Sequence, residues 1–217
     1  VVTKIPKVAK ALVALAVILA TPFAFILTAA LLLLISVKTV SRENFDLAGL
    51  YLNASYLASA IAHKESGVLT NIPFMGSFYT PAGSLSYLIK SASLVGFKTL
   101  DLINEVSALS DDVLSEGDSN LSEIQGKIVA NLAFMETTLS FMEGEVKNYP
   151  NWYQKADLVK IRKLMTNANK MALSLPDLLG GGKSKTYLVL FQNNMELRPT
   201  GGFIGSFALV SFNSGKL

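Results

Sequence analysis

The sequence contains no cysteine and a single histidine, His63, among its 217 residues. The lack of cysteine excludes a disulfide framework, a metal–thiolate site and a cysteine nucleophile. One histidine without a second histidine or a cysteine gives neither a metal site nor a histidine-based catalytic pair. We therefore predict no metal site. No cofactor and no catalytic residue can be identified from the sequence, and whether the protein is an enzyme stays open.

Charge is also scarce, because 16% of the residues are charged and the formal net charge is +3. Several of the lysines flank an apolar run, so we expect no nucleic-acid-binding surface. Apolar residues make up 51% of the chain and the mean hydropathy is +0.42, which is unusual for a soluble globular protein. A membrane segment is therefore expected.

The apolar run at residues 11–37 contains no charged residue. It exceeds the roughly 20 residues that a helix needs to cross a bilayer. A cleaved signal peptide is the alternative, but the apolar core of a signal peptide has only about 7–15 residues and a cleavage site follows it. We predict an uncleaved transmembrane helix in which Thr21 helps to satisfy the carbonyl that Pro22 leaves free.

The charges beside this run predict its orientation. The preceding flank, residues 1–10, carries three basic residues and no acid, namely Lys4, Lys7 and Lys10. After the run, Lys38 and Arg42 are accompanied by Glu43 and Asp46. The excess of positive charge predicts a cytoplasmic N-terminus, with the rest of the chain outside the cell membrane.

Residues 38–179 have a helical pattern and are predicted to form an external helical bundle. Apolar residues recur at three- and four-residue steps over residues 45–65, which predicts a helix that continues straight out of the membrane and stops near Gly67. The segment 66–83 holds Pro73 and Pro81 among glycines, and is predicted to be a packed loop or a pair of short turns.

Three further amphipathic helices follow, and Asn120 is placed to cap the second of them with Glu123 at the third position. Helices joined by short loops pack antiparallel, and the helix after the anchor can supply a fourth member. Acids dominate residues 101–145 and bases the third helix, whose basic side is either an ordinary solvated face or a surface for anionic lipid or glycan. The apolar stripes are Leu85, Leu88, Ala92, Val95, Thr99, Leu102, Val106, Leu109 and Val113; Leu121, Ile124, Ile128, Leu132, Met135, Leu139, Met142 and Val146; and Leu158, Ile161, Met165, Ala168, Ala172 and Leu175.

The pattern changes from helical to extended after a triple glycine, which we take as a linker over residues 180–186. Residues 187–191 are predicted to be a buried strand and residues 203–212 a second strand, followed by a turn at 213–215. Two strands are not independently stable. We therefore expect residues 187–217 to be the first strands of an incomplete α/β or mixed-sheet domain, in a membrane-anchored α+β protein that continues beyond Leu217.

A polar connection, residues 192–202 with the sequence QNNMELRPTGG, joins the two strands. Arg198 and Glu196 with amide and glycine donors suit an anionic ligand such as phosphate. The alternative is a structural turn in which Asn side chains bond the loop backbone and the glycines supply positive φ. The candidate ligand-binding residues are Gln192, Asn193, Asn194, Glu196, Arg198, Gly201 and Gly202.

The connection resembles the bacterial envelope family catalogued as domain of unknown function 4012, which has a Gln-Asn-Asn-x-Glu-Leu-Arg-Pro-Thr-Gly-Gly-Phe motif after a strand. Residues 175–180, LPDLLG, are similar to the end of the helical region in that family. More distantly, the chain is similar to the LytR-CpsA-Psr envelope proteins, which resemble phosphotransferases acting on polyprenyl-pyrophosphate-linked glycans. They place an arginine for the pyrophosphate in the region of Arg198, but differ at residues 192–194 and 201–202.

The resemblance implies a single-pass envelope protein that binds or handles an anionic polyprenyl-linked glycan in cell-envelope assembly. Its expected partners are the lipid bilayer and that glycan. The alternative function is a non-catalytic surface, scaffold or adhesion-type protein, in which the helices space a head domain from the membrane.

Overall fold

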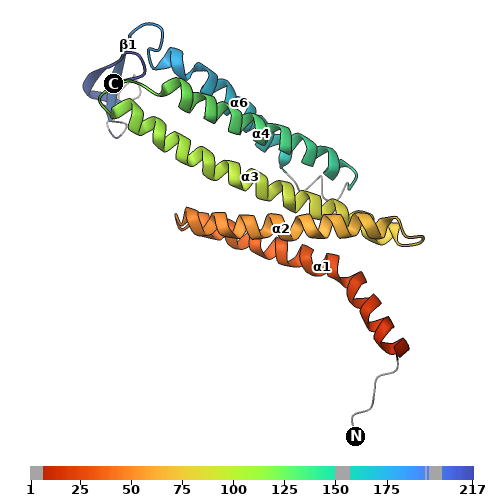
Figure 1. Ribbon diagram of the computed structural model, residues 1–217. Helices are drawn as coiled ribbons and strands as arrows, with labels where there is room; N and C mark the ends of the chain where they lie inside the picture. Colours follow the sequence, from red (N-terminus) through yellow and green to blue (C-terminus); the bar gives the residue numbers. More distant parts are fainter. Residues whose placement is uncertain (1–6, 150–156, 194, 196–201) are drawn as a thin grey trace. The chain divides into compact units, whose positions relative to one another are not determined.

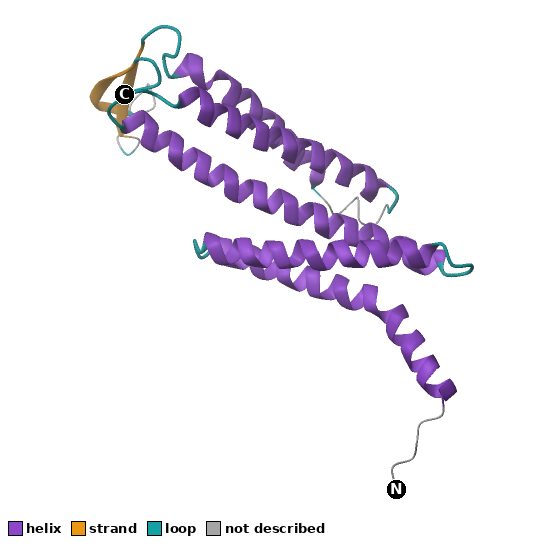
Figure 2. Ribbon diagram, in the orientation of Figure 1, coloured by secondary structure: helices purple, strands orange, loops and turns teal. Residues whose placement is uncertain are grey.

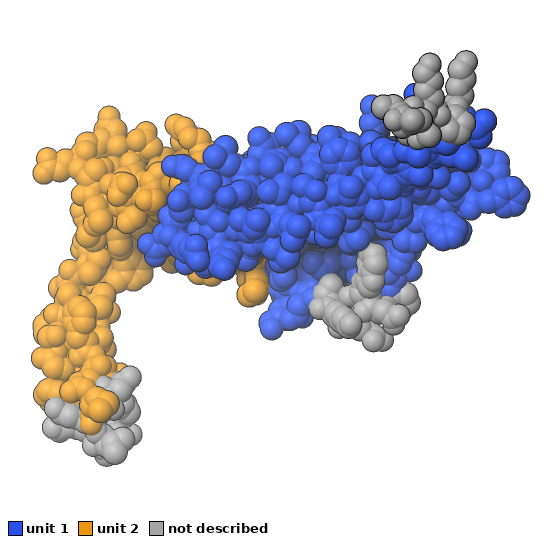
Figure 3. Space-filling model, turned by 90° about the horizontal axis from the view of Figure 1, so that it is seen from below, with its two compact units in different colours: residues 1–100, 135–162 blue, residues 101–134, 163–217 orange. Residues whose placement is uncertain are grey.

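The computed structural model describes residues 7–149, 157–193, 195 and 202–217. The chain is mostly helical and ends in a small antiparallel sheet of two strands (Figures 1 and 2). It divides into two compact units (Figure 3), which are Val1–Leu100 with Met135–Arg162 and Asp101–Phe134 with Lys163–Leu217. The elements in chain order are α1 (Lys7–Val40), α2 (Phe45–Thr70), α3 (Gly76–Leu114), α4 (Leu121–Lys147), α6 (Leu158–Leu178), β1 (Lys185–Asn193) and β2 (Phe203–Phe212).

Helix α1 contains the predicted apolar run. Residues 8–40 are long and apolar enough to cross a membrane, with a mean hydropathy of 2.6 in the most apolar window. Pro22 lies inside the helix and is fully buried. Because proline has no N–H, the carbonyl of Ile18 loses its helical partner. The Thr21 hydroxyl donates to that carbonyl at 2.8 Å, so the predicted role of Thr21 is confirmed.

Helix α2 does not continue straight out of α1, so that prediction is wrong. The chain turns at residues 41–44, where Glu43 has a φ of 60°, and the Asn44 side chain accepts from Leu47 N at 3.1 Å to cap α2. Helix α2 then lies beside α1 (Figure 1), and the Ser55 hydroxyl donates to the Ala29 carbonyl at 2.8 Å. The two helices α1 and α2 therefore form a helical hairpin.

The contact faces within this first unit consist largely of alanine and serine. Buried serines on α2 and α3 donate to carbonyls one turn earlier, as Ser59 does to Ser55 and Ser93 to Ile89. The Ser93 hydroxyl also lies 3.0 Å from the Ser55 hydroxyl, so its one proton is shared between Ile89 and Ser55 and links α3 to α2. Small side chains allow helices to approach closely, as they do in membrane helix bundles. One apolar core joins α1, α2 and α3 through Ile26, Ala29, Ala58, Ala62, Ala82 and Ile89.

The predicted loop at residues 66–83 is wrong over most of its length. Helix α2 runs to Thr70, and α3 begins at Gly76 with Pro81 inside its second turn. Pro81 is the sixth residue of α3, so its missing N–H leaves the carbonyl of Ser77 without its helical donor. The predicted stripe of α3 is only half-buried over residues 85–99. The buried positions of α3 are Tyr79, Ala82, Ser84, Ser86, Ile89, Ser91, Ser93 and Asp112.

The second unit has a core of larger side chains. Ile124, Ile128 and Leu132 of α4 are buried with Ala172 of α6, and residues such as Leu109 of α3 pack against them. The predicted stripe of α4 is confirmed, because all eight of its side chains are buried. Helix α4 begins at Leu121 as predicted. The side chain that accepts from Leu121 N belongs to Ser119, and Glu123 pairs with Lys127 one turn later.

The two predicted strands form a hairpin with β2 at the predicted bounds. Strand β1 is longer than predicted and is not buried, since Leu188 and Phe191 are 59% and 55% exposed. A hairpin of two strands has no second layer to cover its faces, which explains the exposure. Within the described residues, the sheet has two strands, β1 and β2.

Candidate functional site

The polar connection joins β1 to β2 at the end of the hairpin where Asn193 pairs with Phe203. Gln192 pairs with Ile204 and Asn193 with Phe203, after a bulge between Phe191 and Gln192. A bulge twists the strand and turns the side chains that follow it. The bulge therefore determines how Gln192 and Asn193 are presented.

Gly202 lies against these two residues. Its φ is +151°, and a Cβ atom there would lie 2.8 Å from both the Asn193 carbonyl oxygen and Gln192 Nε2. No other residue fits this conformation and this space without strain. Three of the predicted site residues are thus brought together.

Asn193 also has a structural role at this end of the hairpin. Its side-chain oxygen accepts from Met195 N at 3.0 Å, which is the Asx-turn pattern predicted for a structural loop. Asn194, Glu196, Arg198 and Gly201 lie outside the described residues. A ligand site at Arg198 and a Glu196–Arg198 pair both stay predictions.

The opposite end of the hairpin is fixed to the helices of the same unit. Ser214 and Gly215 have positive φ, as a two-residue hairpin turn requires, which confirms the predicted turn. The N–H groups of Ser214 and Gly215 donate to Gly180 and Leu179, and that of Leu217 donates to Val113.

A buried ionic cluster completes this attachment. Asp112 accepts from Asn120 N, Ser119 Oγ and Lys216 Nζ at 3.0–3.1 Å. The hydrogen bond from the Asn120 backbone is the main cause that lowers the pKa of Asp112; burial acts in the opposite direction, and Lys216 and Ser119 lower it further. Asp112 therefore remains a carboxylate that can hold the hairpin.

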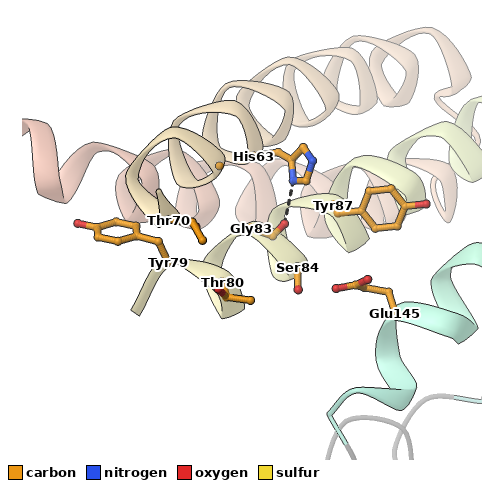
Figure 4. Close-up of a pocket in the computed structure, with 9 residues that line it drawn as sticks. His63, Thr70, Tyr79, Thr80, Gly83, Ser84, Tyr87 and Glu145 are labelled. Carbon is orange, nitrogen blue, oxygen red and sulfur yellow. Dashed lines mark hydrogen bonds between the residues drawn. The ribbon is translucent and has the colours of Figure 1, made fainter. Parts of the chain in front are cut away.

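A pocket in the first unit, whose lining includes a histidine, two tyrosines and a glutamate, was missed by the sequence analysis (Figure 4). It has a volume of about 320 Å³ and lies among α2, α3 and Glu145 of α4. His63 Nδ1 lies 3.0 Å from the Gly83 carbonyl, so Nδ1 carries the proton that is donated. Tyr149 donates to Ser84 at 3.0 Å. The lining residues are His63, Gly67, Thr70, Tyr79, Thr80, Gly83, Ser84, Tyr87 and Glu145.

The sequence held a signal for this pocket. His63, Gly67 and Thr70 on α2 are spaced by four and three residues, as are Thr80, Ser84 and Tyr87 on α3. Such spacing places each set on one helix face. This pattern was not recognised because residues 66–83 were predicted to be a loop and not parts of two helices. Among the described residues, no group of three or more acidic, histidine or cysteine side chains is arranged to hold a metal ion.

The fold so far defines a helical protein with an apolar N-terminal helix and a C-terminal β-hairpin. A family model described as "Protein of unknown function (DUF4012)" matches residues 183–217. The predicted resemblance to that family is confirmed for these residues, which include both strands and the polar connection. No curated protein and no solved structure matches the chain.

Proposed function

We propose that the chain is a membrane-anchored protein of the bacterial envelope that binds an anionic, polyprenyl-linked glycan at the end of its β-hairpin where the polar connection joins β1 to β2. The observation that carries this proposal is the meeting of Gln192, Asn193 and Gly202 after a bulge. The missing Cβ of Gly202 lets the Asn193 backbone and the Gln192 amide lie close to it, and amide side chains donate hydrogen bonds to phosphate oxygens.

Arg198 is the proposed charged partner of the ligand. Its guanidinium has the planar fork that binds two phosphate oxygens at once, and Glu196 is the proposed group that orients it. Helix α1 supplies the anchor in this proposal. The bases before its apolar run favour a cytoplasmic N-terminus and place the hairpin outside.

The experiment is a calorimetric titration of the protein in lipid nanodiscs with a polyprenyl pyrophosphate. Wild type is expected to bind saturably, and Arg198→Ala to weaken binding about tenfold or more, because a charge-assisted hydrogen bond is lost. Lys183→Ala is the matched control, since it removes an exposed base of the same unit and should leave affinity unchanged. Equal affinity of the wild type and Arg198→Ala would contradict the assigned role of Arg198.

A second candidate is a non-catalytic scaffold, and the attachment at Asp112 favours it. The cluster at Asp112 and Lys216 fixes one end of the hairpin, while apolar side chains of both strands, such as Leu188 and Phe207, remain exposed. This arrangement suits a hairpin on which further strands assemble. A well-folded wild type that gives no heat in the titration would leave this second candidate ahead.

A further inference from the structure

The apolar run of α1 limits which residues can lie in a bilayer. About 20 residues fill the hydrocarbon core. A span within residues 11–37 therefore starts no later than about residue 18 and ends no earlier than about residue 30. Every such span contains the residues between these two positions, so whatever packs on this part of α1 lies at the bilayer.

Helix α2 packs on that part of α1. The Ser55 hydroxyl donates to the carbonyl of Ala29 at 2.8 Å, and Ala58 and Ala62 share a buried core with Ile26 and Ala29. These contacts join the middle of α2 to the middle of the candidate span. If α1 crosses a membrane, α2 therefore lies beside it at the level of the bilayer.

The outer faces of the two helices are apolar and exposed. On each helix the exposed residues are separated by three, four or seven positions, which places them along one side. A groove joins the two sides, and it is lined by Ile18, Thr21, Ile61, Lys64, Glu65, Val68 and Leu69. This α1–α2 face consists of Phe23, Leu27, Leu31, Leu34, Leu50, Leu57, Ile61 and Val68, with exposed fractions of 43–67%.

The charged residues of α2 leave a long uncharged stretch in the part of the helix that packs on α1. Asp46 and Lys64 enclose an uncharged stretch, residues 47–63. This stretch is shorter than the roughly 20 residues of a crossing helix. Asn53 and Lys64 are exposed on the same side of α2. The stem of Lys64 is long enough to bring its ammonium to the headgroups while neighbouring residues contact acyl chains.

We propose that the α1–α2 face contacts the acyl chains of the bilayer that α1 enters, so that α2 is a second membrane-contacting helix. This inference rests on the membrane anchoring in the proposed function. The hydropathy of α2 alone does not predict this contact, because the opposite side of α2 consists of small residues that pack against α1 and α3.

The test uses single cysteines, which the cysteine-free chain permits. Leu31→Cys on α1 and Leu57→Cys on α2 replace residues that are 52% and 53% exposed, so both variants should fold and react equally. Ser140→Cys, at an exposed position of α4, is the control. Each variant carries the fluorophore NBD in phosphatidylcholine–phosphatidylglycerol vesicles, with and without spin-labelled lipid.

We expect the spin-labelled lipid to quench the probes at residues 31 and 57 to a similar extent, and several-fold more than the probe at 140. Quenching at 31 with none at 57 would overturn the inference and leave the anchor intact. Quenching at neither position would refute the proposed anchoring and the inference with it. Equal quenching at all three positions would also overturn the inference, because no distinct membrane-facing side would exist.

Discussion

The ammonium of Lys216 lies 3.1 Å from the carboxylate of Asp112, which is 104 residues earlier in the chain. Both side chains are largely buried, and Lys216 also donates to the Asp112 carbonyl and to Ser115. The contact connects the matched family segment to the end of α3. The hairpin is therefore part of the helical unit that precedes it in the chain.

Replacing Asp112 should loosen the hairpin. Asp112→Asn leaves the buried ammonium of Lys216 without its carboxylate, and breaking such a pair is costly. The expected result is a lower Tm and faster amide hydrogen exchange in β2. Asp111→Asn removes the same charge from the neighbouring exposed position and should change neither. Equal Tm values for the two variants would show that the cluster does not stabilise the unit.

Stability should also depend on pH. Hydrogen bonds led by Asn120 N for Asp112, and by Lys147 for Glu143, lower the pKa of both carboxyl groups. A lowered pKa in the folded state stabilises the protein above the ordinary carboxyl pKa of about 4, and this contribution is lost as the pH falls through the folded-state pKa. Thermal unfolding between pH 7 and pH 3 should show Tm falling below about pH 4.

The double variant Asp112→Asn with Glu143→Gln is the control for this pH dependence. It should have a lower Tm than wild type at pH 7, and its Tm should fall less on acidification. A wild-type Tm that rises as the pH drops would have the opposite sign to that expected.

Truncation in the core of the second unit should be severe. Leu132 is 2% exposed, so Leu132→Ala should lower the free energy of unfolding by about 2–5 kcal/mol. Leu114 of the same unit is 67% exposed, and Leu114→Ala should stay within about 0.5 kcal/mol of wild type. Denaturant titration measures both values, and similar losses for the two would refute the assignment of this core.

Gly202 provides a test at the candidate site. A methyl group there would meet the Asn193 carbonyl at 2.8 Å in a backbone with φ of +151°, so Gly202→Ala should cost about 1–3 kcal/mol. Gly205 on the same strand has only ordinary contacts, the nearest at 3.9 Å, and Gly205→Ala should be nearly neutral. Hydrogen exchange of β1 and β2 in the two variants checks this difference. An unperturbed Gly202→Ala would contradict the described geometry.

The sequence predicted elements whose contacts involve large apolar side chains. The stripe of α4 was found because leucine, isoleucine and methionine recur at three- and four-residue steps. The turn after β2 was found because asparagine, serine and glycine are common turn residues, and Ser214 and Gly215 have the positive φ that it requires. In both cases the local pattern and the final packing agree.

The first unit was harder to predict because its contact faces use alanine and serine. Ser55, Ser59 and Ala62 are buried on α2, yet none of them adds to a pattern of large apolar residues. Pro81 suggested a loop because its place in the second turn of a helix is known only once the start of that helix is fixed. At the candidate site, Gln192, Asn193 and Gly202 lie together because of the way β1 pairs with β2. The register of two strands cannot be read from the local sequence of either strand.

The most direct test of the account is the location of residue 118 in intact cells. Asp118→Cys lies in an exposed turn of a cysteine-free chain, so a membrane-impermeant maleimide should label it without lysis if α1 anchors the protein with its N-terminus inside. A cysteine added before Val1 should react only after lysis. Labelling of residue 118 only after lysis would contradict an external hairpin and, with it, the proposed binding of envelope glycan.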